Sequence, residues 1–282
     1  MNVSNLLSEE QVDKFHNDGF LAIPSFYDRK KEIEPIQYAI YEIIGLLIKK
    51  YSLNIERKPF DPESFDSGYQ EVIRHDRKIG GEIYDAVKQI PAFMRLVCNE
   101  KHDFLFSQLR GTNLPGIAGG GVGIRIDNPN EEKFRAGWHQ DYPAQFRSLD
   151  GIVFWSPLVT MTEDIGPVQL SVGSHKDGLV PLYTSDVRNL EKSGAYGLTF
   201  KDEEEVISRY PLVAPLTSPG DLLLIDFLTV HASGFNKSER SRWSMQMRYF
   251  NYLEPTGIRI GWKGSFAAGN SIKEIHPELI VD

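Results

Sequence analysis

The sequence predicts a mainly β protein with flanking helices, in which a β-sandwich or jelly roll is braced by an N-terminal helical region. Two observations support this fold class. Helical patterns account for much of residues 1–110, whereas from residue 122 onward short strand-like runs alternate with turn residues. Roughly eight short strands separated by turns are typical of a sandwich or jelly roll. The expected strands cover residues 122–127, 136–141, 151–158, 167–171, 179–182, 210–214, 222–231 and 242–252.

The first elements are expected to be a helix, a short strand and a longer helix. Ser8 and Gln11 form a capping-box pattern, in which each side chain satisfies a backbone N–H of the other residue, and Gly19 suits the left-handed turn that ends many helices. Residues 20–24 are a plausible strand. The next helix shows an apolar stripe that would pack on a sheet, formed by Ile36, Ile40, Ile43, Ile44 and Leu47.

Three irregular stretches are expected to be loops or turns before helices resume over residues 82–110 and strands begin. Residues 55–70 mix Pro, Asp and Ser without periodicity and are a candidate border of the active site. The glycine-rich residues 116–123 precede a strand and lack the G-K-[ST] of a phosphate loop, which favours a flexible turn. The acidic run 202–205, within a long connection over residues 183–209, is expected to be a solvated face.

Length and composition predict one domain. The chain of 282 residues contains 41% hydrophobic residues and has no Ser/Gly/Pro linker, so residues 1–282 are expected to share one core. Within it we expect a helical bracing region over residues 1–110, a β core over residues 120–252 and a C-terminal tail over residues 253–282.

Charge and targeting signals narrow the partners and the compartment. A net charge of −8 disfavours binding to nucleic acids and to anionic membranes, because the long-range field repels both. The most apolar helix, residues 36–48, is too short to span a bilayer. The N-terminus lacks the pattern of a secretory signal, and the single Cys98 excludes an intramolecular disulfide. We therefore expect a cytoplasmic protein.

The motif Trp138-His-Gln-Asp141, together with the distant His231 and Arg242, is the strongest functional signal. Two imidazoles and one carboxylate on one face of an Fe(II) ion leave positions open for a cosubstrate and dioxygen. In a strand, His139 and Asp141 would point to the same side, and His231 ends an apolar run expected to be another strand. An H-x-D pair alone carries little information, so the combination predicts the metal site.

Arg242 is expected to return to the metal after a polar loop reverses the chain. Alternation along the strand then places polar residues on one face, namely Arg242, Ser244, Gln246 and Arg248, and apolar residues on the other, namely Trp243, Met245, Met247 and Tyr249. A buried guanidinium needs an anion, and its planar fork fits a carboxylate. A dicarboxylate cosubstrate would satisfy it; the alternative is a structural ion pair with Asp221 or Asp226.

The chain resembles the phytanoyl-CoA dioxygenase family of Fe(II)/2-oxoglutarate-dependent oxygenases over most of its length. Residues 6–20 are similar to the N-terminal segment of the family, and Trp138-His-Gln-Asp141 is similar to its metal strand. Residues 163–176, which end in Gly-Ser-His-Lys, resemble its central stretch. The closing segment, residues 231–238 with Arg242, is the most specific match.

The resemblance implies a double-stranded β-helix, the jelly-roll or cupin-like core of the family, and an oxidative reaction. It implies hydroxylation of an unactivated C–H bond, driven by O2, with conversion of 2-oxoglutarate to succinate and CO2. Asp141 favours hydroxylation, since related halogenases carry a small residue at that position. The implied iron ligands are His139, Asp141 and His231, and the implied cosubstrate residues are Arg242, Ser233 and Trp155.

The substrate is expected to be a small metabolite or a natural-product intermediate. An acyl-CoA is disfavoured, because no basic cluster suits its phosphates. Residues that would determine the substrate are expected in loops 55–70, 112–120 and 183–209. His175 is an alternative metal ligand, but a structural hydrogen-bonding role is favoured. Candidate substrate contacts, which are equally compatible with solvated strand edges, are Arg125, Tyr142, Gln145, Arg147 and Arg248.

Two other function classes are compatible with the same fold. A non-catalytic jelly-roll protein that binds a small molecule such as a saccharide would not bind 2-oxoglutarate tightly. A cupin-like metal isomerase would have no need for Arg242. Binding of the cosubstrate therefore separates the oxygenase from both alternatives.

Overall fold

Strand β11 is central to the larger of the two main sheets. The structure is a computed structural model that describes residues 6–186, 188, 197–264 and 268–281. The larger sheet has the order β1-β9-β4-β11-β2, with β3 also paired to β11, and its pairs are antiparallel. Its strands are β1 (Phe20–Ile23), β2 (Pro115–Ile117), β3 (Gly123–Asp127), β4 (Gly151–Pro157), β9 (Leu222–Asp226) and β11 (Arg242–Asn251).

The smaller sheet has the order β10-β5-β8 and is also antiparallel. A cavity between the two sheets is lined by residues of both. These antiparallel sheets, with helices at their flanks, confirm the predicted mainly β, jelly-roll fold class. The strands of the smaller sheet and of a separate two-stranded pair are β5 (Val168–Ser171), β8 (Leu212–Val213), β10 (His231–Ser233), β6 (Leu182–Tyr183) and β7 (Thr199–Phe200).

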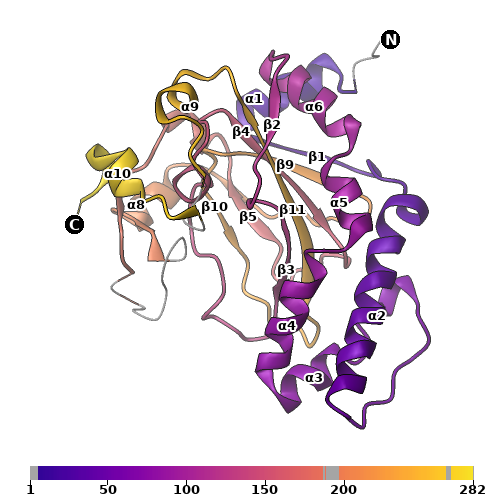
Figure 1. Cartoon of the computed structure of the whole chain (residues 1–282). Coiled ribbons are helices and arrows are strands. Elements are labelled where there is room, and N and C mark those ends of the chain that lie inside the picture. Colours follow the sequence, from indigo (N-terminus) through magenta and orange to yellow (C-terminus); the bar gives the residue numbers. More distant parts are fainter. Residues whose placement is uncertain (1–5, 187, 189–196, 265–267, 282) are drawn as a thin grey trace.

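The N-terminal helices pack on the face of the larger sheet that points away from the cavity (Figure 1). In Figure 1 they form the indigo and magenta layer beside the strands. The elements of this layer are α1 (Glu9–Asp18), η1 (Arg29–Ile33), α2 (Glu34–Lys50), η2 (Pro62–Ser64), α3 (Tyr69–His75), α4 (Arg77–Val87), α5 (Pro91–Val97) and α6 (Glu100–Arg110).

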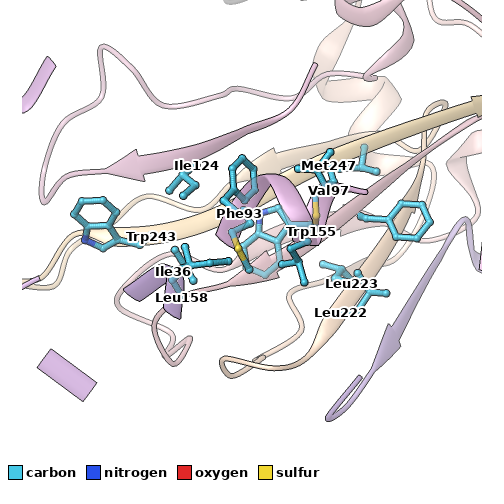
Figure 2. Packing of buried hydrophobic residues seen from close by; sticks show 14 of the residues in the cluster. Ile36, Phe93, Val97, Ile124, Trp155, Leu158, Leu222, Leu223, Trp243 and Met247 are labelled. Carbon is cyan, nitrogen blue, oxygen red and sulfur yellow. The ribbon is translucent and has the colours of Figure 1, made fainter. Parts of the chain in front are cut away.

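Alternation along β11 separates the hydrophobic core from the cavity, as predicted. Trp243, Met245, Met247 and Tyr249 are fully buried and belong to the core cluster that includes α2 and α5. The Tyr249 hydroxyl donates to a backbone carbonyl of α5 at 2.6 Å. Figure 2 shows part of this packing, in which helical and sheet residues interdigitate: Ile36, Phe93 and Val97 come from the helices, and Ile124, Trp243 and Met247 come from the sheet.

The capping box at the start of α1 is formed as predicted. Ser8 Oγ accepts from the Gln11 N–H at 3.2 Å, and Gln11 Oε1 accepts from the Ser8 N–H at 2.9 Å. Gly19 ends the helix in the left-handed region, with φ of 79°. Its O accepts from the Asp226 N–H at 2.9 Å, which ties the helix end to the larger sheet.

Two of the predicted strands are wrong, and both carry metal-ligand candidates. Residues 136–141 form no extended strand; only His139 makes a single β-bridge, and the short helix α7 (Tyr142–Gln145) begins directly after Asp141. The run 222–231 is broken, because Asp226 ends β9 by accepting the N–H of Leu228 on its side chain, so that the chain turns and crosses to the smaller sheet.

The three stretches predicted to be irregular contain some regular structure. Residues 55–70 contain η2 and the first residues of α3. The glycine-rich residues 116–123 include the end of β2 and the first residue of β3, and residues 118–122 between them form the turn, with Gly120 at φ of 79°. The acidic run begins α8 (Glu203–Ser208), but Glu203 pairs with Arg188 at 2.8 Å and lines the cavity. Because Arg188 lies outside the acidic run in the sequence, the residues of the run alone predicted only a solvated face.

The C-terminal tail packs beside the cavity wall. Its elements include α9 (Pro255–Ile260), α10 (Ile272–Ile275) and η6 (Pro277–Leu279). Ile260, Ile272 and Ile275 form a small cluster with Phe146 and Leu182. Leu182, from β6, also lines the cavity, so the tail supports part of its wall. Among the described residues, no helix is long and apolar enough to cross a membrane.

We expect Ile40→Ala, in the buried face of α2, to lower the free energy of unfolding by about 2–5 kcal/mol, because it leaves a cavity against the sheet. Leu46→Ala, on the exposed face of the same helix (64% exposed), is expected to change it by no more than about 0.5 kcal/mol. Chemical denaturation measures both. Equal effects would contradict the assignment of the packed face.

Candidate metal centre and its cavity

Three side chains that were predicted as metal ligands converge at one end of the cavity. The potential ligand atoms of His139, Asp141 and His231 all lie within 4.8 Å of one another. Among the described residues, this is the group of side chains that could hold a metal ion. Backbone pairing sets the arrangement: the His139 N–H donates to the His231 carbonyl at 2.9 Å, and the reverse bond is 3.0 Å. The Asp141 N–H donates to the Phe227 carbonyl at 3.0 Å.

Both imidazoles are oriented by backbone carbonyls. His139 Nδ1 lies 2.8 Å from the Gly137 O, and His231 Nδ1 lies 2.9 Å from the Thr229 O. Because a carbonyl oxygen only accepts, each Nδ1 must carry the proton, which leaves the lone pair on Nε2 in a neutral ring. Such partners fix the tautomer and direction of metal-binding histidines. Both rings are therefore prepared to donate through Nε2.

The two carboxylate oxygens of Asp141 differ, because one accepts a hydrogen bond and the other does not. Oδ1 accepts from Arg248 Nε at 2.9 Å. Oδ2 is buried, has no hydrogen-bond partner among the described residues, and lies 3.4 Å from His231 Nε2. A buried, unpartnered carboxylate oxygen beside two imidazole nitrogens is what a divalent cation would satisfy. The cluster fits an iron ion on this ground.

The protonation states also suit metal binding. Burial, reinforced by the neighbouring His231, lowers the pKa of His139 to about 3, so its ring is neutral near pH 7. Burial opposes ionisation of Asp141, but attraction to Arg248 and, less strongly, to the two histidines holds the pKa of the carboxyl below its usual value. Neutral imidazoles and an ionised carboxylate are the forms that coordinate metals.

The cavity next to the cluster has a volume of about 530 Å³, within the range of small-molecule sites. Several candidates of the sequence analysis line it: Ser233, Trp155, Arg125, Gln145 and Arg248. Of the three loops expected to determine the substrate, only residues 183–209 contribute described lining residues; loops 55–70 and 112–120 do not. The residues of loop 183–209 that line the cavity include Asp186, Arg188 and Phe200, which the sequence did not single out within that loop. Gln246 lines it from the predicted polar face of β11, and Trp138, from the metal motif, lines it without having been predicted to.

Arg242 is fully buried behind the cavity wall and has partners that were not expected. Its guanidinium contacts Asp127 Oδ2 at 2.7 Å, Ser233 Oγ at 2.8 Å and the Gly166 carbonyl. Neither Asp221 nor Asp226 pairs with it: Asp221 accepts from backbone N–H groups, and Asp226 pairs with Arg110. The carboxylate partner of Arg242 is therefore Asp127 on β3, and neither of the two predicted aspartates.

Arg125 also contacts Asp127, so two arginines converge on one carboxylate. Arg125 Nη2 lies 2.7 Å from Asp127 Oδ1. Burial opposes ionisation of Asp127, but Arg125 and Arg242 outweigh it and lower its pKa to about 2. The three groups together carry a net charge of +1. Ser233 and Arg125 line the cavity, whereas Arg242 is not among its described lining residues.

Tyr142 and Arg147, which were predicted as substrate contacts, have structural partners instead. The Tyr142 side chain is fully buried, and its hydroxyl lies 2.8 Å from Nε2 of His276 in the C-terminal segment. Arg147 donates to the carbonyls of Gln145 and Gly119. Neither lines the cavity. The chain enters α7 directly after Asp141, so these two residues do not continue the segment that carries His139 and Asp141.

The remaining candidates divide between the cavity and the scaffold. Gln145 lines the cavity, and its buried Oε1 has no partner among the described residues. Trp155 is 3% exposed, and belongs both to the core cluster and to the cavity wall. His175 Nε2 lies 3.0 Å from the His16 O and is outside the metal cluster, as expected for a structural histidine.

A family model described as "Phytanoyl-CoA dioxygenase (PhyH)" matches residues 15–244. Among curated proteins, no relative matches the chain. Solved structures give low-identity similarities that extend over most of the chain. The EctD structure from S. alaskensis, with 2-oxoglutarate and 5-hydroxyectoine, has 17% identity and a TM-score of 0.56, and the match covers 89% of this chain and 78% of that one.

Two further structures are similar at the same level. The non-heme alpha ketoglutarate dependent carbocyclase SnoK from nogalamycin biosynthesis has 17% identity and a TM-score of 0.54, with 87% of this chain and 85% of that one covered. The epimerase SnoN, in complex with Fe3+, alpha ketoglutarate and nogalamycin RO, has 17% identity and a TM-score of 0.55, with 89% and 88% covered. At these identities the similarity establishes the fold.

We expect Tyr142→Phe to lower the free energy of unfolding by about 1 kcal/mol, because it removes the buried hydrogen bond to His276. Metal affinity is expected to stay at the wild-type value, since the tyrosine does not line the cavity. Denaturant titration and isothermal titration with Co(II) measure the two quantities. Loss of metal binding with an unchanged free energy of unfolding would contradict this and indicate that Tyr142 contributes to the metal site.

Proposed function

Because the chain belongs to the phytanoyl-CoA dioxygenase family, we propose that it is an iron(II)- and 2-oxoglutarate-dependent oxygenase that hydroxylates a small organic molecule. The observation that carries the proposal is the cluster of two Nε2 lone pairs and one unpartnered carboxylate oxygen beside a cavity. Two histidines and one carboxylate with open positions are typical of non-haem Fe(II) oxygenases.

His139, Asp141 and His231 would hold the iron. When bound, the iron supplies activation of dioxygen, coupled to conversion of 2-oxoglutarate to succinate and CO2 and to oxidation of the substrate. His139 provides a neutral imidazole, Asp141 an ionised carboxylate and His231 a ring whose Nε2 faces that carboxylate, in a largely buried environment. Because the Asp141 carboxylate would occupy a coordination position of the iron, that position would not be open to a halide. The aspartate therefore favours hydroxylation.

Ser233 and Arg242 would hold the far carboxylate of 2-oxoglutarate, with Trp155 as part of the wall. Ser233 lines the cavity and accepts from Arg242 at 2.8 Å, so it links the cavity to the buried guanidinium. Arg242 Nε is buried without a partner among the described residues. This unpartnered donor belongs to a planar guanidinium beside the Ser233 hydroxyl, and such a group suits the oxygens of a carboxylate.

The outer cavity favours a substrate without strong negative charge. Arg188 pairs with Glu203 at 2.8 Å and with Asp186 at 3.4 Å. Arg135 pairs with Glu132 at 2.7 Å. Since these arginines already have carboxylate partners, they do not form a basic site for the phosphates of an acyl-CoA. A small metabolite or a natural-product intermediate fits the cavity better than a CoA thioester.

We expect His139→Ala and His231→Ala to abolish succinate formation from 2-oxoglutarate and to weaken Fe(II) binding by more than about 100-fold, because loss of a direct ligand exceeds the effect of losing an outer-shell partner. His75→Ala, an exposed histidine, is the control and is expected to behave as wild type. Anaerobic Fe(II) titration and succinate detection measure both. Wild-type turnover in the His139 variant would exclude the proposed centre.

We expect Ser233→Ala to raise the Kd of 2-oxoglutarate by about tenfold, because it removes one hydrogen bond to a charged group. Fe(II) affinity is expected to be unchanged. Ser244→Ala removes a buried hydroxyl from β11 that has no partner among the described residues, and it is the matched control. Titration with the analogue N-oxalylglycine, followed by thermal shift, tests the site; no stabilisation of the metal-loaded wild type would favour a non-catalytic binding protein.

A further inference from the structure

Arg248 lies on the cavity-facing side of β11 and is bound to the carboxylate of the metal cluster. Its Nε and Nη2 both reach Asp141 Oδ1 at 2.9 Å. The two side chains are 11% and 3% exposed, so the ion pair is almost completely removed from solvent. A pair in this environment is strong only if the remaining donors and acceptors are also satisfied.

The other contacts of Arg248 fix the plane of its guanidinium. Nη1 donates to the Gly121 carbonyl at 2.9 Å, and Nη2 donates to Gln246 Oε1 at 3.0 Å. One partner comes from the turn before β3, one from the same strand and one from the metal cluster. Because three acceptors in different directions are used, the position of Arg248 does not depend on Asp141 alone.

This arrangement makes the two oxygens of Asp141 unequal. Oδ1 is held by Arg248, whereas Oδ2 has no partner among the described residues and faces His231 Nε2 at 3.4 Å. Asp141 lies outside any strand, directly before α7, so the sheet does not determine where its side chain points. The guanidinium is therefore the main group that sets the direction of this carboxylate.

We propose that Arg248 is a positioning residue that presents Asp141 to the metal through Oδ2 alone. The inference rests on the proposed function and adds a role for a residue that lines the cavity. With Oδ1 occupied, the carboxylate coordinates through one oxygen, and a coordination position remains for the cosubstrate or dioxygen. Lysine cannot replace this role, because a single ammonium does not reproduce the planar fork.

Cobalt(II) is the probe for the test, since its visible spectrum reports coordination number without turnover. We expect Arg248→Met to bind Co(II) about 10–100-fold more weakly than wild type, as is typical when an outer-shell partner is lost. Its cobalt spectrum is expected to shift to that of a higher-coordinate ion as the carboxylate becomes bidentate. Arg248→Lys is expected to recover part of the affinity through its charge but not the wild-type spectrum.

Arg110→Met is the matched control, because it removes another buried arginine that has aspartate partners, Asp150 and Asp226, and that does not line the cavity. The turn toward His231 keeps its own contact, since the Leu228 N–H donates to Oδ1 of Asp226 and Arg110 binds Oδ2. This variant is expected to lose stability but to keep the wild-type Co(II) affinity and spectrum. If it loses Co(II) binding as Arg248→Met does, general destabilisation explains the effect and the inference is overturned.

The possible failures are distinguishable. If wild type binds Co(II) no better than His139→Ala, the metal centre and the proposed function fail together. If wild type binds Co(II) and Arg248→Met gives the same Kd and spectrum, only the positioning role is overturned. If Arg248→Met does not fold by circular dichroism, the spectrum of Arg248→Lys decides: a wild-type spectrum overturns the inference, and a higher-coordinate spectrum supports it.

Discussion

The backbone pairing of His139 with His231 is the constraint on which the site depends. The two reciprocal hydrogen bonds, at 2.9 and 3.0 Å, join segments far apart in the chain and bring the two rings to a centroid distance of 4.2 Å. The turn after Asp226 carries the chain from the larger sheet to the smaller one, and this crossing places His231 opposite His139.

Strand β11 connects the stability of the fold with the chemistry of the site. Its apolar face is buried against the helices, and its polar face carries Arg242 and Arg248 toward the cavity side. Each buried arginine has an aspartate partner, Asp127 or Asp141, which offsets the cost of removing charge from water. Breaking such a pair from one side costs about 3–5 kcal/mol, so the site residues also constrain the fold.

Local sequence patterns predicted structure more accurately than patterns whose outcome depends on distant residues. The capping box of α1 and the two faces of β11 are local patterns, and both were confirmed. The strand expected over residues 136–141 was wrong, although His139 and Asp141 still converge. An apolar run also concealed the turn at residues 227–230, because hydrophobic residues can fill a buried turn as well as a strand.

By itself, the sequence determined the chemical character of the centre. The two histidines, the aspartate and the arginine that follows them are residue types that can be read directly from the chain. The alternation of β11 was likewise determined locally, because successive side chains in a strand point to opposite faces. Only the tertiary structure decided the partners: Asp127 for Arg242, and Arg248 for Asp141. Pairing between distant residues depends on strand register and on where the chain crosses between sheets, and neither is written in local sequence patterns.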